Sequence, residues 1–497
     1  MKRTKTIAPL SYPVIPIMKA DTRAEKQVFK ASAELQLATG YPEELPENWH
    51  DIVLEKMRHK LKTSRALRVF MDSCVQCGAC TDKCHYFLGG GDPKNMPVAR
   101  QNLFRSVYKR YFTWPGKLFP WLVGARDLTR SVLDEWFEYF YQCSECRRCS
   151  VYCPVGIDTS EVSMAGREIL ASVGMGQKYT QTVIDKVNTI GNNLGMPQAA
   201  LKDTLLGLEE DILEETGVAV ELPLDRPNVD ILLVVPSADF FAEPHVDGLI
   251  GYAKVLHAAG LSWTLSSTAS EAANFGLFNG NQEHMQGIAE RVRDGAKALG
   301  VKRIVFGECG HAWRVAYNYL QDLAGSFDFL DQRYPIPQHI IELTHGLIGE
   351  GRLQFDKQRN DDFVVTFHDS CNVARGASFG DKPGGQFTVP REVLHSVCEH
   401  VYEMPKSSTH DETFCCGAGG GLLTDEIMPT RIQGALPRMS ALQQVINDHG
   451  VTHMVAICAI CKSQFSSVMP SYGHEIDQVL SLHQLVGNAL LLSTPQD

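Results

Sequence analysis

The C-terminal half of the chain alternates short apolar runs with longer stretches of helical periodicity. The runs "VDILLVV", "VKRIVF", "DFVVTF" and "VTHMVAI" have strand length, and each leads into a polar turn and then a helix-forming segment. This order of strand, turn and helix is typical of α/β units that share a parallel sheet. We therefore predict an α/β region from residue 229 to the end of the chain.

The α/β region contains two similar halves, predicted as 229–350 and 351–497. Their strands align when Val301 is placed opposite Val451, and the first strand of each half aligns in the same way. The first half then carries acids and a histidine where the second half carries sulfur. The alignment pairs Glu308 with Cys458, His311 with Cys461 and Asp239 with Cys371.

The N-terminal half follows a different pattern, with few strand-like runs. Residues 1–65 are polar and partly helical, and the first of them, "MKRTKTIAPLSYPVIPIMKAD", indicate an extended arm because prolines interrupt the apolar stretch. Cysteines crowd into 66–160. A connector with helical periodicity fills 161–228 and ends in "LPLDRPN", a pattern typical of a linker.

Composition narrows the classes of function. A chain of 497 residues is too long for one hydrophobic core, so two to four domains are expected. The net charge of -11 argues against nucleic acid as the main partner. No apolar run approaches the ~18 residues that span a bilayer. Fifteen cysteines in a chain without an export signal favour metal or redox chemistry over disulfides.

Two cysteine motifs in the N-terminal half have the same spacing. "CVQCGACTDKCHY" and "CSECRRCSVYCPVG" both read C-x2-C-x2-C-x3-C. This spacing is typical of [4Fe–4S] ferredoxins, in which the fourth cysteine of each motif binds the other cluster. We therefore predict two cubane clusters with crossed ligands: Cys74, Cys77, Cys80 and Cys153 for one, and Cys143, Cys146, Cys149 and Cys84 for the other. The alternative is a pair of structural zinc sites, although zinc prefers two separated C-x2-C pairs.

Between these motifs lies a basic and aromatic segment, 100–131. It holds seven lysines or arginines and a single acid, Asp127, with aromatic residues interleaved in "YKRYFTWPGKLFPWLVGARD". One interpretation is an insertion that packs on the ferredoxin-like core and presents a solvated basic face. The other is a docking surface at the level of lipid headgroups, where Trp, Tyr and Lys are favoured.

A second group of cysteines lies in the last part of the chain. Cys458 and Cys461 follow the run "HMVAI", where a strand meets a helix N-terminus, a position that favours thiolates. Alone, "CAIC" also fits a thioredoxin-like redox pair. Three more cysteines, however, fall at strand ends or in the glycine-rich "CCGAGGG" of the same half: Cys371, Cys415 and Cys416. Ligands of α/β proteins bind at such strand ends.

The layout C-xn-CCG-xm-C-x2-C behind two ferredoxin motifs resembles the CCG-domain family of heterodisulfide reductases and related iron–sulfur oxidoreductases. The resemblance implies a multidomain protein of α+β and α/β class, with a helical bis-[4Fe–4S] ferredoxin-like domain followed by a duplicated α/β CCG domain. It further implies one non-cubane [4Fe–4S] cluster at which disulfides are cleaved. By motif position its ligands are Cys371, Cys415, Cys416, Cys458 and Cys461. Here the two spacers are longer than the usual pattern, and only one repeat is complete.

Within this family, the incomplete first half and the single CCG set most resemble the DsrK branch, the catalytic subunits of the membrane complex DsrMKJOP of dissimilatory sulfur metabolism. That implies a peripheral subunit on the cytoplasmic side of the membrane, with a DsrM-like cytochrome b and other complex subunits as partners. Its substrate would be the disulfide or trisulfide of a DsrC-like protein. Sulfite reducers and sulfur oxidisers would use the same residues.

Two further functions remain open on the residues alone. One is an iron–sulfur relay subunit of a 2-hydroxyacid or glycerol-3-phosphate oxidase, which would receive electrons from a separate flavoprotein. The other is a non-enzymatic scaffold that carries clusters or zinc within a larger assembly. Flavin co-purification and metal analysis separate these alternatives from a disulfide reductase.

The first half of the α/β region keeps "GECGHAWR", with Cys309 and His311. Two interpretations fit these residues equally well. Either both are buried core residues, or both face the cluster, where His311 could give a proton to a leaving thiolate. Cys398 lies at helical spacing in "REVLHSVCEH" and is predicted to belong to the core.

Overall fold

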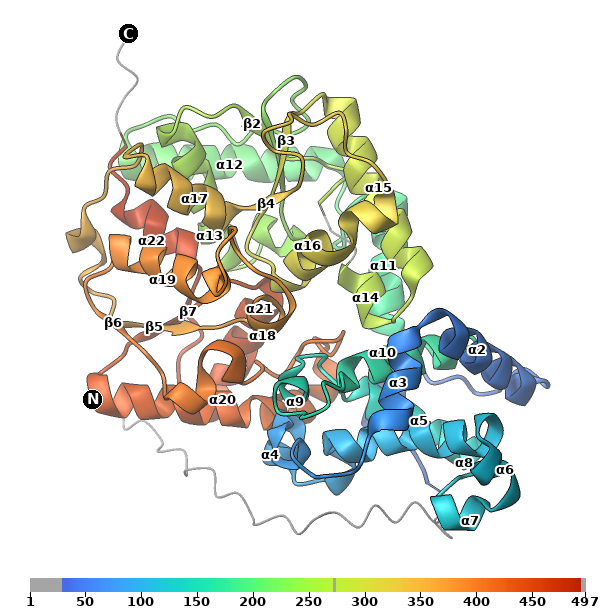
Figure 1. The fold of residues 1–497 in the computed structure, drawn as a ribbon. Coiled ribbons are helices and arrows are strands. Elements are labelled where there is room, and N and C mark those ends of the chain that lie inside the picture. Colours follow the sequence, from blue (N-terminus) through green and yellow to red (C-terminus); the bar gives the residue numbers. More distant parts are fainter. Residues whose placement is uncertain (1–28, 271–273, 493–497) are drawn as a thin grey trace.

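The computed structural model describes residues 29–270 and 274–492, and the predicted extended arm, residues 1–21, lies outside them. Figure 1 shows a helical N-terminal part beside a larger part that holds two sheets. Each part has its own hydrophobic core, and a third, smaller core surrounds the cysteines of the last half of the chain. The two-part architecture confirms a helical domain followed by an α/β region.

The N-terminal part is built around a buried aromatic helix. Thr129 caps it by accepting a hydrogen bond from the backbone N–H of Val132. Trp136 is fully buried and stacks on Phe104 of a neighbouring helix, with ring centroids 5.2 Å apart. The helices of this part are α1 (Ala33–Thr39), α2 (Trp49–Thr63), α3 (Arg65–Ser73), α4 (His85–Gly90), α5 (Pro97–Phe112), α6 (Trp114–Leu118), α7 (Pro120–Val123), α8 (Arg130–Tyr141) and α9 (Arg148–Val151).

Three helices connect this part to the sheets: α10 (Thr159–Ala171), α11 (Lys178–Ile190) and α12 (Gln198–Thr216). The segment 222–228 that follows them is packed against the first sheet. Leu222 is 2% exposed, and Leu224 forms a parallel bridge with Leu265 at the sheet edge. This segment therefore contacts the edge of the first sheet through one bridged residue pair, and its predicted role as a linker stays a prediction.

The first sheet has the strand order β2-β1-β3-β4, and all its paired strands are parallel. β1 and β3 are buried along their whole length, because helices cover both faces of a parallel sheet. Its strands are β1 (Ile231–Val234), β2 (Trp263–Thr264), β3 (Arg303–Phe306) and β4 (Gln338–His339). Its helices are α13 (His245–Ala258), α14 (Asn274–Phe278), α15 (Gln282–Leu299), α16 (Gly310–Ala324) and α17 (Ile340–Gly349).

The second sheet repeats this arrangement with the order β6-β5-β7-β8, again all parallel. Its strands are β5 (Val365–His368), β6 (Val401–Tyr402), β7 (His453–Ala456) and β8 (Val479–Leu480). Its helices are α18 (Cys371–Gly376), α19 (Gly385–Val397), α20 (Met428–His449), α21 (Ala459–Val468) and α22 (Leu482–Ala489). The two halves exchange helix contacts, since α22 packs against α13 and α17 packs against α19.

The strand positions test the alignment of the two halves. Glu308 stands two residues after β3, and Cys458 stands two residues after β7, so this predicted pair is equivalent in the structure. The pairing of Asp239 with Cys371 is wrong by two residues. Ser237, three residues after β1, occupies the position that Cys371 has after β5. The error arose because the apolar runs are longer than the strands they form, which hides the register.

Candidate iron–sulfur sites

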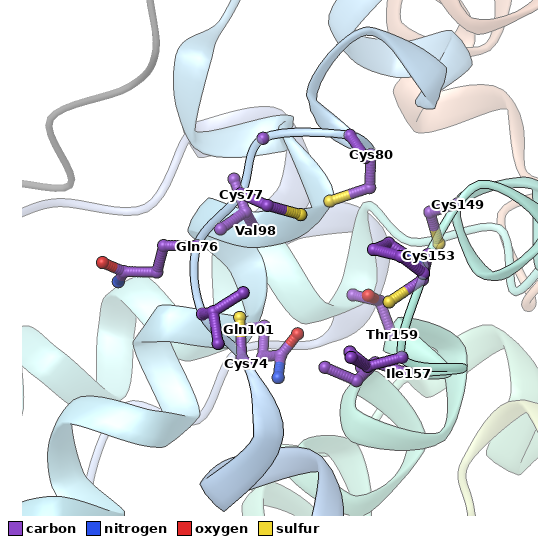
Figure 2. A pocket seen from close by; sticks show the side chains of 15 residues that line it. Cys74, Gln76, Cys77, Cys80, Val98, Gln101, Cys149, Cys153, Ile157 and Thr159 are labelled. Atoms are coloured by element: carbon purple, nitrogen blue, oxygen red, sulfur yellow. The ribbon is translucent and has the colours of Figure 1, made fainter.

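A cavity lies between the loop after α3 and the segment after α9. Figure 2 shows that cysteines from these two distant segments surround it. Burial, together with the neighbouring Cys153 and Cys74, raises the pKa of Cys80 to about 12. Iron supplies the positive charge that lets such crowded sulfurs bind as thiolates, so the residues fit a cluster. The cysteines that line the cavity are Cys74, Cys77, Cys80, Cys149 and Cys153.

The structure thus brings together all four members of the first predicted ligand set, and it adds Cys149 to the same wall. Cys153 comes from the second motif, which is the crossed arrangement that the spacing predicts. Among the described residues, no group of three or more His, Cys, Asp or Glu side chains is arranged to hold a single metal ion. The assignment of ligands to clusters stays a prediction.

The second predicted set gathers around a buried arginine. Arg100 is 2% exposed, and its guanidinium lies 4.0 Å from the Sγ atom of Cys84. Burial alone would lower the pKa of Arg100, but Cys143, Cys84 and Cys149 raise it. Three of the four sulfurs therefore share one cationic neighbour.

Cys146, the fourth member of that set, contacts the C-terminal half. Its thiol is a hydrogen-bond partner of Cys415, and this contact together with burial raises its pKa well above the usual range. It packs with the apolar core around the CCG cysteines. Cys146 therefore stands between the second cubane set and the CCG set.

The five CCG cysteines form a chain of contacts. Cys415 is a hydrogen-bond partner of Cys371 and Cys416, Cys416 of Cys461, and Cys461 of Cys458. Hydrogen bonds from Cys146 and from its CCG neighbours lower the pKa of Cys415 well below that of an ordinary thiol. All five side chains are at most 2% exposed. The sulfurs that the sequence scatters over 91 positions, from Cys371 to Cys461, meet at the carboxyl ends of β5 and β7.

Cys309 and His311 lie beside this chain of sulfurs. Cys309 is a hydrogen-bond partner of Cys458, and the Nδ1 atom of His311 is 3.6 Å from the Sγ atom of Cys458. The ring of His311 is held edge-on by Phe278, with centroids 4.9 Å apart. Its Nε2 atom is buried and has no hydrogen-bond partner among the described residues. Both residues therefore reach the CCG cysteines, whereas Cys398 is buried in the hydrophobic core as predicted.

The glycines after the CCG motif allow the N-terminal part to approach closely. A Cβ atom on Gly419 would lie 2.5 Å from the carbonyl oxygen of Ser144, and one on Gly420 would lie 2.6 Å from that of Cys143. Gly420 also has a positive φ of 67°. Arg167 donates a hydrogen bond of 2.9 Å to the Gly420 carbonyl and secures the contact. The loop therefore presses the CCG cysteines against the second ferredoxin motif.

Two residues of the site were not recognised from the sequence. His85, which replaces the proline usual after Cys84, contacts Cys415 and places its ring nitrogens 2.8 Å from the Gly434 carbonyl and 2.7 Å from the Ser144 hydroxyl. The sequence pattern places Arg100 on a solvated basic face, but Arg100 is buried, which corrects that interpretation for this position. The one available signal was the departure from the ferredoxin pattern at His85.

A buried ion pair joins the two halves behind the cysteines. The Lys462 ammonium, next to Cys461, lies 3.4 Å from the carboxylate of Glu308. His483 and Ser481 donate hydrogen bonds to the same carboxylate at 2.7 and 2.6 Å. Burial alone would raise the pKa of Glu308, but these partners outweigh it and lower the pKa to about 2. Glu308 is therefore held as a carboxylate at the interface of the halves.

Comparison with known proteins agrees with this arrangement. The 4Fe–4S dicluster domain matches residues 70–157, and the cysteine-rich CCG domain matches residues 365–466. The iron–sulfur subunit 2 of the Hdr-like menaquinol oxidoreductase of Archaeoglobus fulgidus is 40% identical, over 90% of this chain and 85% of the relative. The chain belongs to this family of Hdr-like iron–sulfur oxidoreductase subunits.

More distant relatives extend the comparison. One subunit of the dihydromethanophenazine:CoB–CoM heterodisulfide reductase of Methanosarcina barkeri is 25% identical, over 85% of this chain and 95% of the relative. The EtfAB:quinone oxidoreductase of Syntrophomonas wolfei is 23% identical, over 71% of this chain and 48% of the relative. No solved structure matches this Hdr-like subunit. Binding of [4Fe–4S] clusters and oxidoreductase activity are thus properties of its family.

Proposed function

We propose that this Hdr-like subunit is the catalytic subunit of a membrane-bound electron-transfer complex of sulfur metabolism, at the cytoplasmic face of the membrane, as in the DsrK branch. It reduces, or in the reverse direction forms, the disulfide or trisulfide of a DsrC-like protein. Electrons come from a membrane quinone pool through a DsrM-like cytochrome b subunit. The name of the Archaeoglobus relative, a menaquinol oxidoreductase subunit, supports menaquinol as the donor.

One observation carries the proposal: the partly buried Cys146 contacts Cys415, the first link to the buried CCG sulfurs. It connects a ferredoxin-motif cysteine to the five CCG cysteines without intervening side chains. Electron relays need such short separations, and a site for sulfur chemistry needs several sulfur ligands around one centre. The series supplies both in the same place.

The chemistry requires two electrons and two protons, since R–S–S–R′ + 2e⁻ + 2H⁺ gives R–SH + R′–SH. The ferredoxin-motif cysteines would hold two cubane clusters and the CCG cysteines a non-cubane [4Fe–4S] cluster, and when bound these groups would supply one-electron transfer and an iron site for a sulfur ligand. The buried CCG cysteines exclude water from the site. His311 and Cys309 contact Cys458 from the first half, and His311 would give a hydrogen bond to a departing thiolate bound beside Cys458.

Replacement of a CCG cysteine tests the proposal. Cys416→Ser should abolish disulfide turnover and lower the iron content from about 12 to about 8 per chain, while the EPR signals of the cubane clusters persist. Cys398→Ser is the matched control, because Cys398 is an equally buried cysteine in the hydrophobic core. Normal turnover in Cys416→Ser would reject the proposal.

A relay subunit that receives electrons from a flavoprotein is the second candidate. The relative named EtfAB:quinone oxidoreductase favours it, although this chain spans about half of that protein. Two observations distinguish the functions. A relay subunit would reduce no disulfide when purified alone with an artificial electron donor. It would also co-purify with a flavin-containing partner.

A further inference from the structure

Helices α6 and α7 form a projecting apolar knob, residues 113–124, at the end of the molecule away from both sheets (Figure 1). Trp114 and Trp121 are 71% and 72% exposed. Three further large apolar side chains in the same short segment are also exposed: Leu118, Phe119 and Leu122. Burying so much apolar surface in water-free surroundings would release a substantial free energy.

The knob is rigidly built, so the exposure is a fixed property of the fold. Thr113 caps α6 by accepting a hydrogen bond from Gly116 N–H. A Cβ atom on Gly116 would lie 1.9 Å from the Lys109 carbonyl oxygen, which shows how tightly the turn packs on α5. The Lys109 ammonium donates a 2.8 Å hydrogen bond to the Val123 carbonyl. These bonds face inward and leave the apolar side chains outside.

Basic residues are frequent in the sequence around the knob. The whole chain has a net charge of -11, whereas residues 100–131 carry seven basic residues and one acid. Arg100 is buried beside Cys84, and ion pairs join Arg110 to Asp127, Arg126 to Glu135 and Arg130 to Asp134. Lys117 is exposed between the two tryptophans. The knob thus combines exposed Trp, Phe and Leu side chains with the exposed ammonium of Lys117, on a protein whose net charge is negative.

We propose that the knob binds directly to the surface of an anionic lipid bilayer, with its aromatic and aliphatic side chains among the headgroups. Trp is favoured at that depth, and Lys or Arg beside it pair with anionic phosphate groups. A stable hydrophobic interface with another protein needs a broad complementary surface. A short projecting segment offers less area than that, but it can insert between the headgroups of a fluid bilayer. The described residues contain no helix that could cross a membrane.

Docking by the knob would also orient the electron path. α5 runs from Val98, in the wall of the first cysteine cavity, to Phe112, just before the knob. At 1.5 Å per residue this places the cavity about 21 Å from the knob. The first cluster site would then face the membrane and the CCG site would face away from it. The inference concerns attachment, so it is tested separately from the proposed disulfide chemistry.

The test measures binding of the anaerobically purified full chain to vesicles. Vesicles of phosphatidylcholine with phosphatidylglycerol should bind the chain more tightly than pure phosphatidylcholine, and brominated lipids should quench its tryptophan fluorescence. The double variant Trp114→Ala/Trp121→Ala should lower vesicle affinity about tenfold or more and remove the quenching. Lys117→Glu should weaken binding to the anionic vesicles and leave binding to pure phosphatidylcholine vesicles unchanged.

The matched control is Ile336→Ala/Ile476→Ala, which removes two side chains that are 61% and 62% exposed in loops of the α/β region. It should bind vesicles as the unchanged chain does. Absence of vesicle binding, or equal binding by the tryptophan variant, would overturn the inference. So would a tryptophan variant that binds vesicles normally but no longer assembles with a membrane subunit, because the knob would then be a protein interface. Disulfide turnover with an artificial donor should be unchanged in every variant.

Discussion

The Nδ1 atom of His311 lies 3.6 Å from the Sγ atom of Cys458, although 147 residues separate them in the chain. His311 comes from the first turn of α16 after β3, and Cys458 precedes α21 after β7. The two halves of the α/β region therefore face each other through their strand ends. The half without the cysteine set still contributes side chains to the site.

His311→Ala should lower disulfide turnover about 10²-fold, because general acid catalysis contributes on that order. Iron content and EPR signals should not change, since His311 is not a proposed ligand. Steady-state assays with an artificial electron donor measure the effect. His311→Gln is the comparison variant, because it keeps a hydrogen-bond donor of similar size. Turnover close to normal in His311→Ala would show that His311 takes no part in the reaction.

Cys153→Ala should remove the cluster that Cys74, Cys77 and Cys80 hold, although Cys153 belongs to the other motif. The physical reason is that these cysteines line one cavity. EPR of the dithionite-reduced protein should show the same missing signal in Cys153→Ala and Cys77→Ala. Cys84→Ala should remove the other cubane signal. If Cys153→Ala and Cys143→Ala lose the same signal, ligation is not crossed.

Glu308→Gln should lower the free energy of unfolding by about 3–5 kcal/mol, because it leaves the Lys462 ammonium buried without its carboxylate. Urea unfolding followed by circular dichroism measures the change. The double variant Glu308→Gln/Lys462→Met removes both charges and should recover much of the loss. Equal losses in the single and double variants would show that the pair is not coupled.

The same carboxylate predicts how stability depends on pH. The folded-state pKa of Glu308 is lowered from 4.5 to about 2, so its contribution is complete above pH 4.5 and declines as the pH falls towards 2. The difference in unfolding free energy between the unchanged chain and Glu308→Gln should be constant from about pH 8 to about pH 5. It should shrink below pH 4.5. A difference that grows on acidification would contradict the assignment.

Gly419→Ala should loosen the contact between the CCG loop and the second ferredoxin motif, because its Cβ atom would collide with the Ser144 carbonyl oxygen. We expect a loss of about 1–3 kcal/mol in unfolding free energy and slower electron transfer to the CCG site, measured by stopped-flow reduction. Gly207→Ala is the control. Nothing lies within 4 Å of its Cβ position, and it stands within α12, so it should stabilise slightly. Unchanged electron transfer in Gly419→Ala would show that the loop contact is not needed.

Much of this molecule follows from short-range pattern. The alternation of apolar runs and helical segments predicted the parallel α/β region, because strands buried on both faces must be apolar along their length. Cysteine spacing predicted the two ferredoxin motifs, since three thiols within about seven residues fit one corner of a cubane. The equivalence of Glu308 and Cys458 also followed from alignment alone, since both stand at the same distance from a strand.

Contacts between distant segments came from the tertiary structure alone. The meeting of Cys146 with Cys415, the burial of Arg100 beside Cys84, and the role of His85 between two domains depend on how the helical part packs on the second sheet. Cys146 and Cys415 are 269 positions apart, and no local sequence pattern indicates that they meet. Their contact is set by side-chain packing and by the close backbone approach that the glycines allow. The sequence alone thus determined the two ferredoxin motifs, the CCG motif and the α/β pattern, because these depend on local spacing, and only the packed structure decided which of their cysteines lie together.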